Sequence, residues 1–249
     1  MIQQLFKQMF AEKRIFLAAA ILLFAASFAA TAIQLRGVSD STCFMDAFPA
    51  VSANMRYAIY PIGIFIIIAL LKDEFSISNV LRRKNQLNLW VYLVLKTGLI
   101  SIYLSIATFI SVSIVGLIIG NSFCNWNDPA SFCVYFTNLY FGNINITMLL
   151  ITFFLCILSG MYVVGMVCLI SYWFFNNYIA GAIIALALCI GGTGLQINYN
   201  SKRGITYDMI YQGIDPRYQY IYPLLLVVVL AAFGLLKQKR EFLAKAGES

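Results

Sequence analysis

Residues 89–120 read LWVYLVLKTGLISIYLSIATFISVSIVGLIIG, and Lys96 is the only charged side chain among them. A transmembrane helix needs about 20 consecutive apolar residues, so this stretch can cross a bilayer with some tilt. The rest of the chain has the same character. Of its 249 residues, 61% are hydrophobic and 11% are charged, where soluble proteins have about 45–50% and about 25%. The sequence therefore predicts an all-α integral membrane protein.

Further apolar stretches lie on both sides of this one. Six transmembrane helices are predicted, at about 15–33, 57–71, 89–120, 144–172, 178–195 and 220–236. Residues 1–14 carry apolar side chains at helical spacing, which favours an amphipathic helix lying in the membrane interface; a frayed tail is the alternative. Residues 15–236 then form one six-span domain, and the basic segment 237–249 follows as a tail.

The basic residues set the expected orientation. With the N-terminus inside and six crossings, 12 of the 17 Lys and Arg residues fall on the inner side and the other 5 on the outer side. Lys and Arg are retained on the cytoplasmic side during insertion. We therefore expect a multi-pass protein of the cytoplasmic membrane with both termini in the cytoplasm. The same distribution explains the net charge of +7 without nucleic-acid binding.

Several kinds of chemistry lack the residues that they need. The chain has no histidine, which excludes Ser-His hydrolases, histidine metal sites and histidine proton relays, and we expect no metal site. No charge lies near the centre of a predicted span, which argues against ion-coupled transport. Lys96, near the inner end of its span, is expected to snorkel to the interface. No G-x-x-x-x-G-K-[ST] loop is present, so we expect neither an enzyme nor a cofactor in this chain.

Three of the six cysteines, Cys43, Cys124 and Cys133, fall in predicted outer loops, where oxidation is possible. Cys124 and Cys133 are close enough in sequence to close a short disulfide loop. Reduced thiols are the alternative.

Residues 72–88, KDEFSISNVLRRKNQLN, connect the second and third predicted spans on the inner side. Phe75, Val80 and Leu81 would suit a short helix that docks on a partner, with the basic residues that follow them at its rim. A solvated loop that serves only as a positive-inside signal is the alternative.

The interfacial helix, the six spans with both ends inside, and a loop that runs from an acidic residue through a basic cluster to a lysine together resemble the permease of an ABC-2-type ABC transporter. In this resemblance Glu74 corresponds to the acidic residue that ends the second span. Arg82 or Arg83 corresponds to the basic residue late in the loop, and Lys96 to the lysine that opens the third span. At this length the chain also resembles the permeases of lantibiotic-immunity and related peptide exporters.

The resemblance implies an exporter of a peptide, a lipid-like or another amphipathic substrate. Two permease chains, identical or homologous, would sit in membrane lipid above two ABC ATP-binding subunits that hold ATP and Mg. Contact with the ATP-binding subunit is expected at Glu74, Phe75, Ile77, Val80, Leu81, Arg82, Arg83 and Lys84. The second and fifth spans are the family's usual pathway walls, which makes Tyr60, Phe65, Ile183 and Leu186 candidate lining residues.

Ser101, Ser105 and Thr108 share one face of the third span, because they are spaced by four and three residues. They would either contact a substrate or pack against other helices through small hydroxyl side chains. Two other functions stay open from the sequence: a membrane scaffold that transports nothing, and a membrane enzyme acting on lipid.

Overall fold

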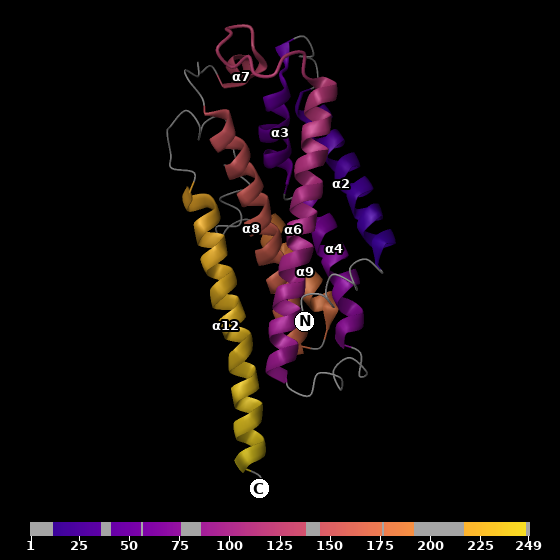
Figure 1. Ribbon diagram of the computed structural model, residues 1–249, viewed down its shortest axis with the longest axis vertical. Helices are drawn as coiled ribbons and strands as arrows, with labels where there is room; N and C mark the ends of the chain where they lie inside the picture. The colour runs from indigo at the N-terminus through magenta and orange to yellow at the C-terminus, as the bar shows by residue number, and fades with distance from the viewer. Residues whose placement is uncertain are drawn as a thin grey trace.

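The computed structural model describes residues 12–35, 41–55, 57–75, 86–137, 145–175, 177–191 and 217–247. Within these ranges the chain is helical, apart from turns and one isolated β-bridge between Cys43 and Ser122 (Figure 1). The elements are α2 (Lys13–Gln34), η2 (Phe44–Asp46), α3 (Ala47–Asn54), α4 (Ile59–Leu71), η3 (Lys72–Phe75), α6 (Gln86–Ile119), α7 (Phe132–Thr137), α8 (Ile146–Phe175), α9 (Tyr178–Gly191) and α12 (Arg217–Gly247). The predicted all-helical class is confirmed.

Three of these helices, α2, α6 and α8, are long and apolar enough to cross a membrane. A fourth crossing results if η2–α3 and α4, which meet at an angle of 67°, are counted as one broken span. Shorter apolar helices cover Ile179–Cys189 and Ile221–Leu236. The chain thus has the helices of a membrane-spanning protein, with three or four candidate crossings where the sequence predicts six. The predicted interfacial helix at 1–14 lies almost wholly outside the described residues.

The C-terminal helix is longer than expected. A polar tail was predicted from 237 onward, but α12 continues without a break to Gly247. The sequence LLKQKREFLAKA before that glycine consists almost entirely of good helix formers and has neither proline nor glycine. Nothing in it ends the helix, so the basic segment continues α12.

α8 lies at the centre of the packing. It contacts α4, α6, α9 and α12. In its most apolar stretch 67% of the residues are buried, against 33% in α2 and 39% in α6. An all-round apolar helix of this kind belongs in the interior, and the other helices cover it.

Close packing between α4 and α8 depends on the absence of a side chain at Gly160. A Cβ atom there would overlap the hydroxyl and ring of Tyr60, which is itself buried. The neighbouring Ser159 donates its hydroxyl to the Cys156 carbonyl at 3.1 Å. Small residues at a helix contact let the two backbones approach closely, which is how membrane helices commonly associate.

We therefore expect Gly160→Ala to destabilise the protein by about 1–3 kcal/mol through overpacking. Adding Tyr60→Phe should restore part of the loss, because the Tyr60 hydroxyl is the atom nearest to the added carbon. Thermal unfolding in detergent measures both. Ala29→Val, on an exposed face of α2, is the control and should change little. A Gly160→Ala protein as stable as the parent would contradict this packing.

Candidate functional site

The strongest concentration of buried charge surrounds Lys96, near the start of α6. Its side chain is only 1% exposed. The Nζ atom donates to the Glu74 Oε1 atom at 2.9 Å and to the Leu70 carbonyl at 2.8 Å. The expectation that Lys96 snorkels to the interface is wrong, because its ammonium group faces the end of α4 and finds its partners there.

Two further side chains complete this group. Tyr92, one turn earlier on α6, donates its hydroxyl to Glu74 Oε1 at 3.1 Å. Glu12, the residue that precedes α2, brings its Oε1 atom to 3.7 Å from Lys96 Nζ. We call Glu12, Leu70, Glu74, Tyr92 and Lys96 the Lys96 cluster. It joins the start of α2, the end of α4 with η3, and the start of α6.

The local backbone explains this geometry. α4 ends at Leu71, and the last carbonyl groups of a helix have no partner within the helix. Lys96 satisfies one of them at Leu70, where the negative end of the helix dipole favours a cation. The 3-10 turn η3 then continues the chain from Lys72 to Phe75 and carries Glu74 to the same ammonium group.

The Lys96 cluster links three helix ends through buried charged and polar groups. Among the described residues no group of three or more His, Cys, Asp or Glu side chains is placed to hold a metal ion. Removing one member of a buried ion pair leaves an uncompensated charge, at a cost of about 3–5 kcal/mol. The cluster therefore couples the position of the end of α4 to that of the neighbouring part of α6.

Of the predicted contacts with an ATP-binding subunit, the structure places Glu74 in the Lys96 cluster. Phe75 is the last residue of the turn η3. The remaining candidates lie outside the described residues: Ile77, Val80, Leu81, Arg82, Arg83 and Lys84.

The three hydroxyl residues of α6 lie inside the bundle. Ser101, Ser105 and Thr108 are fully buried, and each donates to the carbonyl four residues earlier, at 2.9, 2.7 and 2.8 Å respectively. Their hydrogen bonds are satisfied within their own helix. Within one chain they therefore favour the packing interpretation over substrate contact.

The other candidate lining residues do not share one surface. Tyr60 is buried against α8, and Leu186 on α9 is half-buried. Phe65 on α4 and Ile183 on α9 are about as exposed as each other, at 62% and 60%. α4 and α9 pack together. On this pair of helices Tyr60 and Leu186 therefore face the interior, whereas Phe65 and Ile183 lie on an outward apolar surface.

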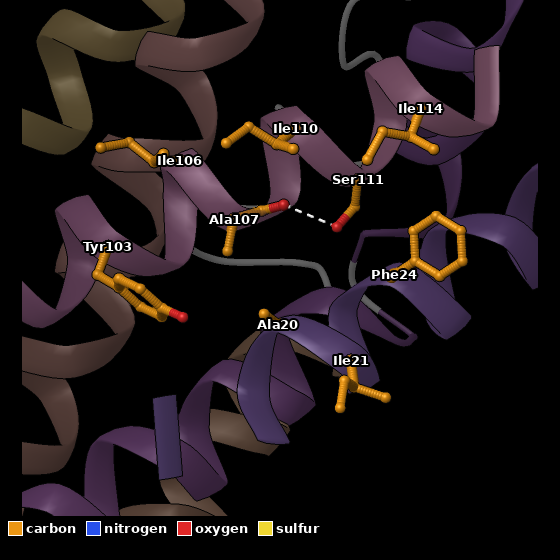
Figure 2. Close-up of a pocket in the computed structure, with 9 residues that line it drawn as sticks. All are labelled: Ala20, Ile21, Phe24, Tyr103, Ile106, Ala107, Ile110, Ser111 and Ile114. Atoms are coloured by element: carbon orange, nitrogen blue, oxygen red, sulfur yellow. Dashed lines mark hydrogen bonds between the residues drawn. The ribbon is translucent and has the colours of Figure 1, made fainter. Parts of the chain in front are cut away.

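An apolar groove of about 390 Å³ lies between α2 and α6. Figure 2 shows its lining side chains on the two helices. They are Ala20, Ile21, Phe24, Tyr103, Ile106, Ala107, Ile110, Ser111 and Ile114. Its polar groups are already bonded, since Tyr103 donates to the Phe16 carbonyl at 2.7 Å and Ser111 to the Ala107 carbonyl at 2.7 Å. The groove therefore suits hydrocarbon.

A second buried charge lies at the opposite end of α6. Asp46 is fully buried, accepting from the Cys43 backbone N–H at 2.8 Å and from the Trp126 indole Nε1–H at 2.7 Å. We call Cys43, Asp46 and Trp126 the Asp46 cluster. It fastens η2 to the segment that follows α6, and nothing in the sequence alone identified it.

Of the two alternatives for Cys124 and Cys133, a disulfide or reduced thiols, the structure has the second, and none of the six cysteines takes part in a disulfide. Cys133 is buried in α7. Cys124 instead lies against Cys43, whose thiol donates a hydrogen bond to its sulfur.

A double-mutant cycle tests whether the Lys96 cluster stabilises the fold. Lys96→Met should cost about 3–5 kcal/mol of unfolding free energy, because the Glu74 carboxylate then stays buried without its cation. Combining it with Glu74→Gln removes both charges and should recover much of this loss. Chemical unfolding in detergent gives the four free energies, and Lys13→Met, at an exposed lysine, is the control. Simple additivity of the two single changes would show that the pair is not coupled.

Compared with known proteins, the chain matches no family model, no curated protein and no solved structure.

Proposed function

We propose that this chain is the transmembrane permease subunit of an ATP-driven ABC exporter of the ABC-2 type. It moves a peptide, a lipid-like or another amphipathic substrate, with ATP and Mg bound by a separate ATP-binding subunit. A second permease chain, identical or homologous, completes the complex. Lantibiotic immunity and related peptide export are the narrower role that we propose.

The observation that carries the proposal is the ion pair between Glu74 and Lys96. Glu74 stands at the beginning of the 72–88 loop, which is the proposed docking segment. Its carboxylate is held at 2.9 Å from the ammonium group of Lys96, on the helix that follows the loop. Both groups are almost fully buried, so the link is not screened by water. A movement of the ATP-binding subunit that displaces the loop would therefore be transmitted to α4 and α6 together.

The missing energy source supports the same function. The chain has no phosphate-binding loop, no histidine and no charge near the middle of a predicted span. Inside the part of the chain that the structure describes, the buried charges lie near the two ends of α6. A transporter built in this way needs energy from another subunit.

The proposed topology has six spans with both termini in the cytoplasm. In Figure 1 α6 runs up the molecule and α12 runs back down, and the C-terminus lies at the end of the molecule where α6 begins. Lys13 at the start of α2 and Lys72 after the end of α4 lie on that same side, because Glu12 and Glu74 beside them both reach Lys96 near the start of α6. By the positive-inside rule this side is cytoplasmic, and the Asp46 cluster faces out.

Cysteine labelling tests this orientation. In a chain with its native cysteines replaced by serine, Lys13→Cys and Lys245→Cys should react with an impermeant maleimide only after the cells are permeabilised. Ala130→Cys, at an exposed position beyond α6, should react in intact cells. Strong outside labelling of either lysine position would overturn the six-span topology.

The coupling loop is tested through the partner subunit. Affinity-purified chain from native membranes should bring with it an ATPase activity that the chain alone, produced in a foreign host, does not have. Arg82→Glu with Arg83→Glu should reduce the copurifying activity about tenfold, and more so at higher ionic strength, because these residues would orient the docked subunit.

The matched control is Lys237→Glu with Lys239→Glu, which makes the same change of charge in the other basic segment on that side and should retain the ATPase. Equal loss in both variants would mean that general surface charge, and not the loop, holds the partner. If no ATPase copurifies with the unaltered chain, a scaffold that transports nothing becomes the better interpretation.

A further inference from the structure

Two chain segments far apart in the sequence run side by side near the Asp46 cluster. The Phe44 N–H donates to the Ser122 carbonyl at 2.8 Å, and the Asn121 N–H donates to the Thr42 carbonyl at 3.1 Å. The rings of Phe44 and Phe123 stack with their centroids 5.0 Å apart. These contacts fix residues 42–45 against residues 121–124.

This arrangement brings two thiols together. The Cys43 side chain donates a hydrogen bond to the Cys124 sulfur, and the Cys43 sulfur is itself close to the Asn125 backbone N–H. A disulfide requires the two sulfurs to approach to about 2.05 Å from such a contact.

We propose that Cys43 and Cys124 form a disulfide at the outward end of the molecule, where an external disulfide oxidises them. The inference rests on the orientation proposed above, because only an outward position exposes the pair to an oxidising compartment. It does not depend on transport or on an ATP-binding subunit.

The two thiols are unequal, and this inequality defines their roles. Cys43 is 2% exposed, whereas Cys124 is partly accessible. The hydrogen bond from Cys43 lowers the pKa of Cys124 to about 6, with help from the Trp126 backbone N–H, although partial burial and the negative charge of Asp46 act against it. The same hydrogen bond, together with burial, raises the pKa of Cys43. Cys124 is therefore the attacking thiolate and Cys43 the resolving thiol.

The chemistry balances as thiol–disulfide exchange. The Cys124 thiolate attacks one sulfur of the external disulfide R–S–S–R, which forms a mixed disulfide and releases one RS⁻. Cys43 then loses its proton and attacks the Cys124 sulfur, which forms the Cys43–Cys124 bond and releases the second RS⁻. The two protein thiols are oxidised, and the external disulfide is reduced to two thiols.

Oxidised glutathione, added to the purified full-length chain, is the probe for this order of events. The unaltered chain should lose two of its six thiols and carry no bound glutathione, and peptide mapping should recover the Cys43–Cys124 link. Cys43→Ser should stop at a stable mixed disulfide on Cys124. Cys124→Ser should react at least tenfold more slowly, because the remaining thiol is buried. Cys133→Ser is the matched control and should behave as the parent does.

The peptide map of the unaltered chain does not depend on whether a variant folds. A Cys124–Cys133 link in it, or no internal link at all, would overturn the proposal. So would glutathione that accumulates on Cys43 and not on Cys124. A chain whose termini label from outside, yet whose purified form makes the Cys43–Cys124 link, would refute the topology and the outward oxidation but leave the reactivity of the pair intact.

Discussion

A lysine that is 1% exposed in an apolar bundle imposes a strict requirement on everything near it. Burying an unpaired ammonium group costs more free energy than a protein of this size can spare, so partners must be supplied. Here they come from a helix end and from the turn after it, the Leu70 carbonyl and the Glu74 carboxylate. Because one partner belongs to the last turn of α4 and the other to the turn η3 that follows it, the burial of this one side chain constrains how α4 and α6 meet.

Near the opposite end of α6 a buried charge is again satisfied by hydrogen bonds, but there the charge is negative. Asp46 is buried just before α3, and its carboxylate is satisfied by one backbone N–H and by the indole of Trp126, beyond the end of α6. Apolar contacts between helices are weakly directional in a membrane, since lipid is as apolar as the side chains. Two buried charges, one near each end of α6, therefore supply directional contacts that the apolar surfaces between them lack.

The helices could be predicted from the sequence much better than their contacts. Apolar runs identify α2, α6 and α8, because twenty apolar residues have few alternatives to a helix that spans a bilayer. Hydropathy does not say which face of a helix meets which neighbour. Lys96 therefore looked like a snorkelling residue, and Cys124 was assigned to the nearer cysteine in sequence. Glu74 and Lys96 were both singled out, but only the turn η3 brings them together.

The interior of the described chain also bears on how a permease of this kind could work. The hydroxyl groups of Ser101, Ser105 and Thr108 donate their hydrogen bonds to carbonyl groups of their own helix. The side chain of Tyr60 occupies the space next to Gly160. A polar substrate would find few unsatisfied groups along this path. The apolar side chains of Phe65 and Ile183, in contrast, point outward from α4 and α9. If the chain is a permease, a passage between two chains is therefore easier to build than one through a single chain, since it would need those outward faces to separate and not the packed interior to open.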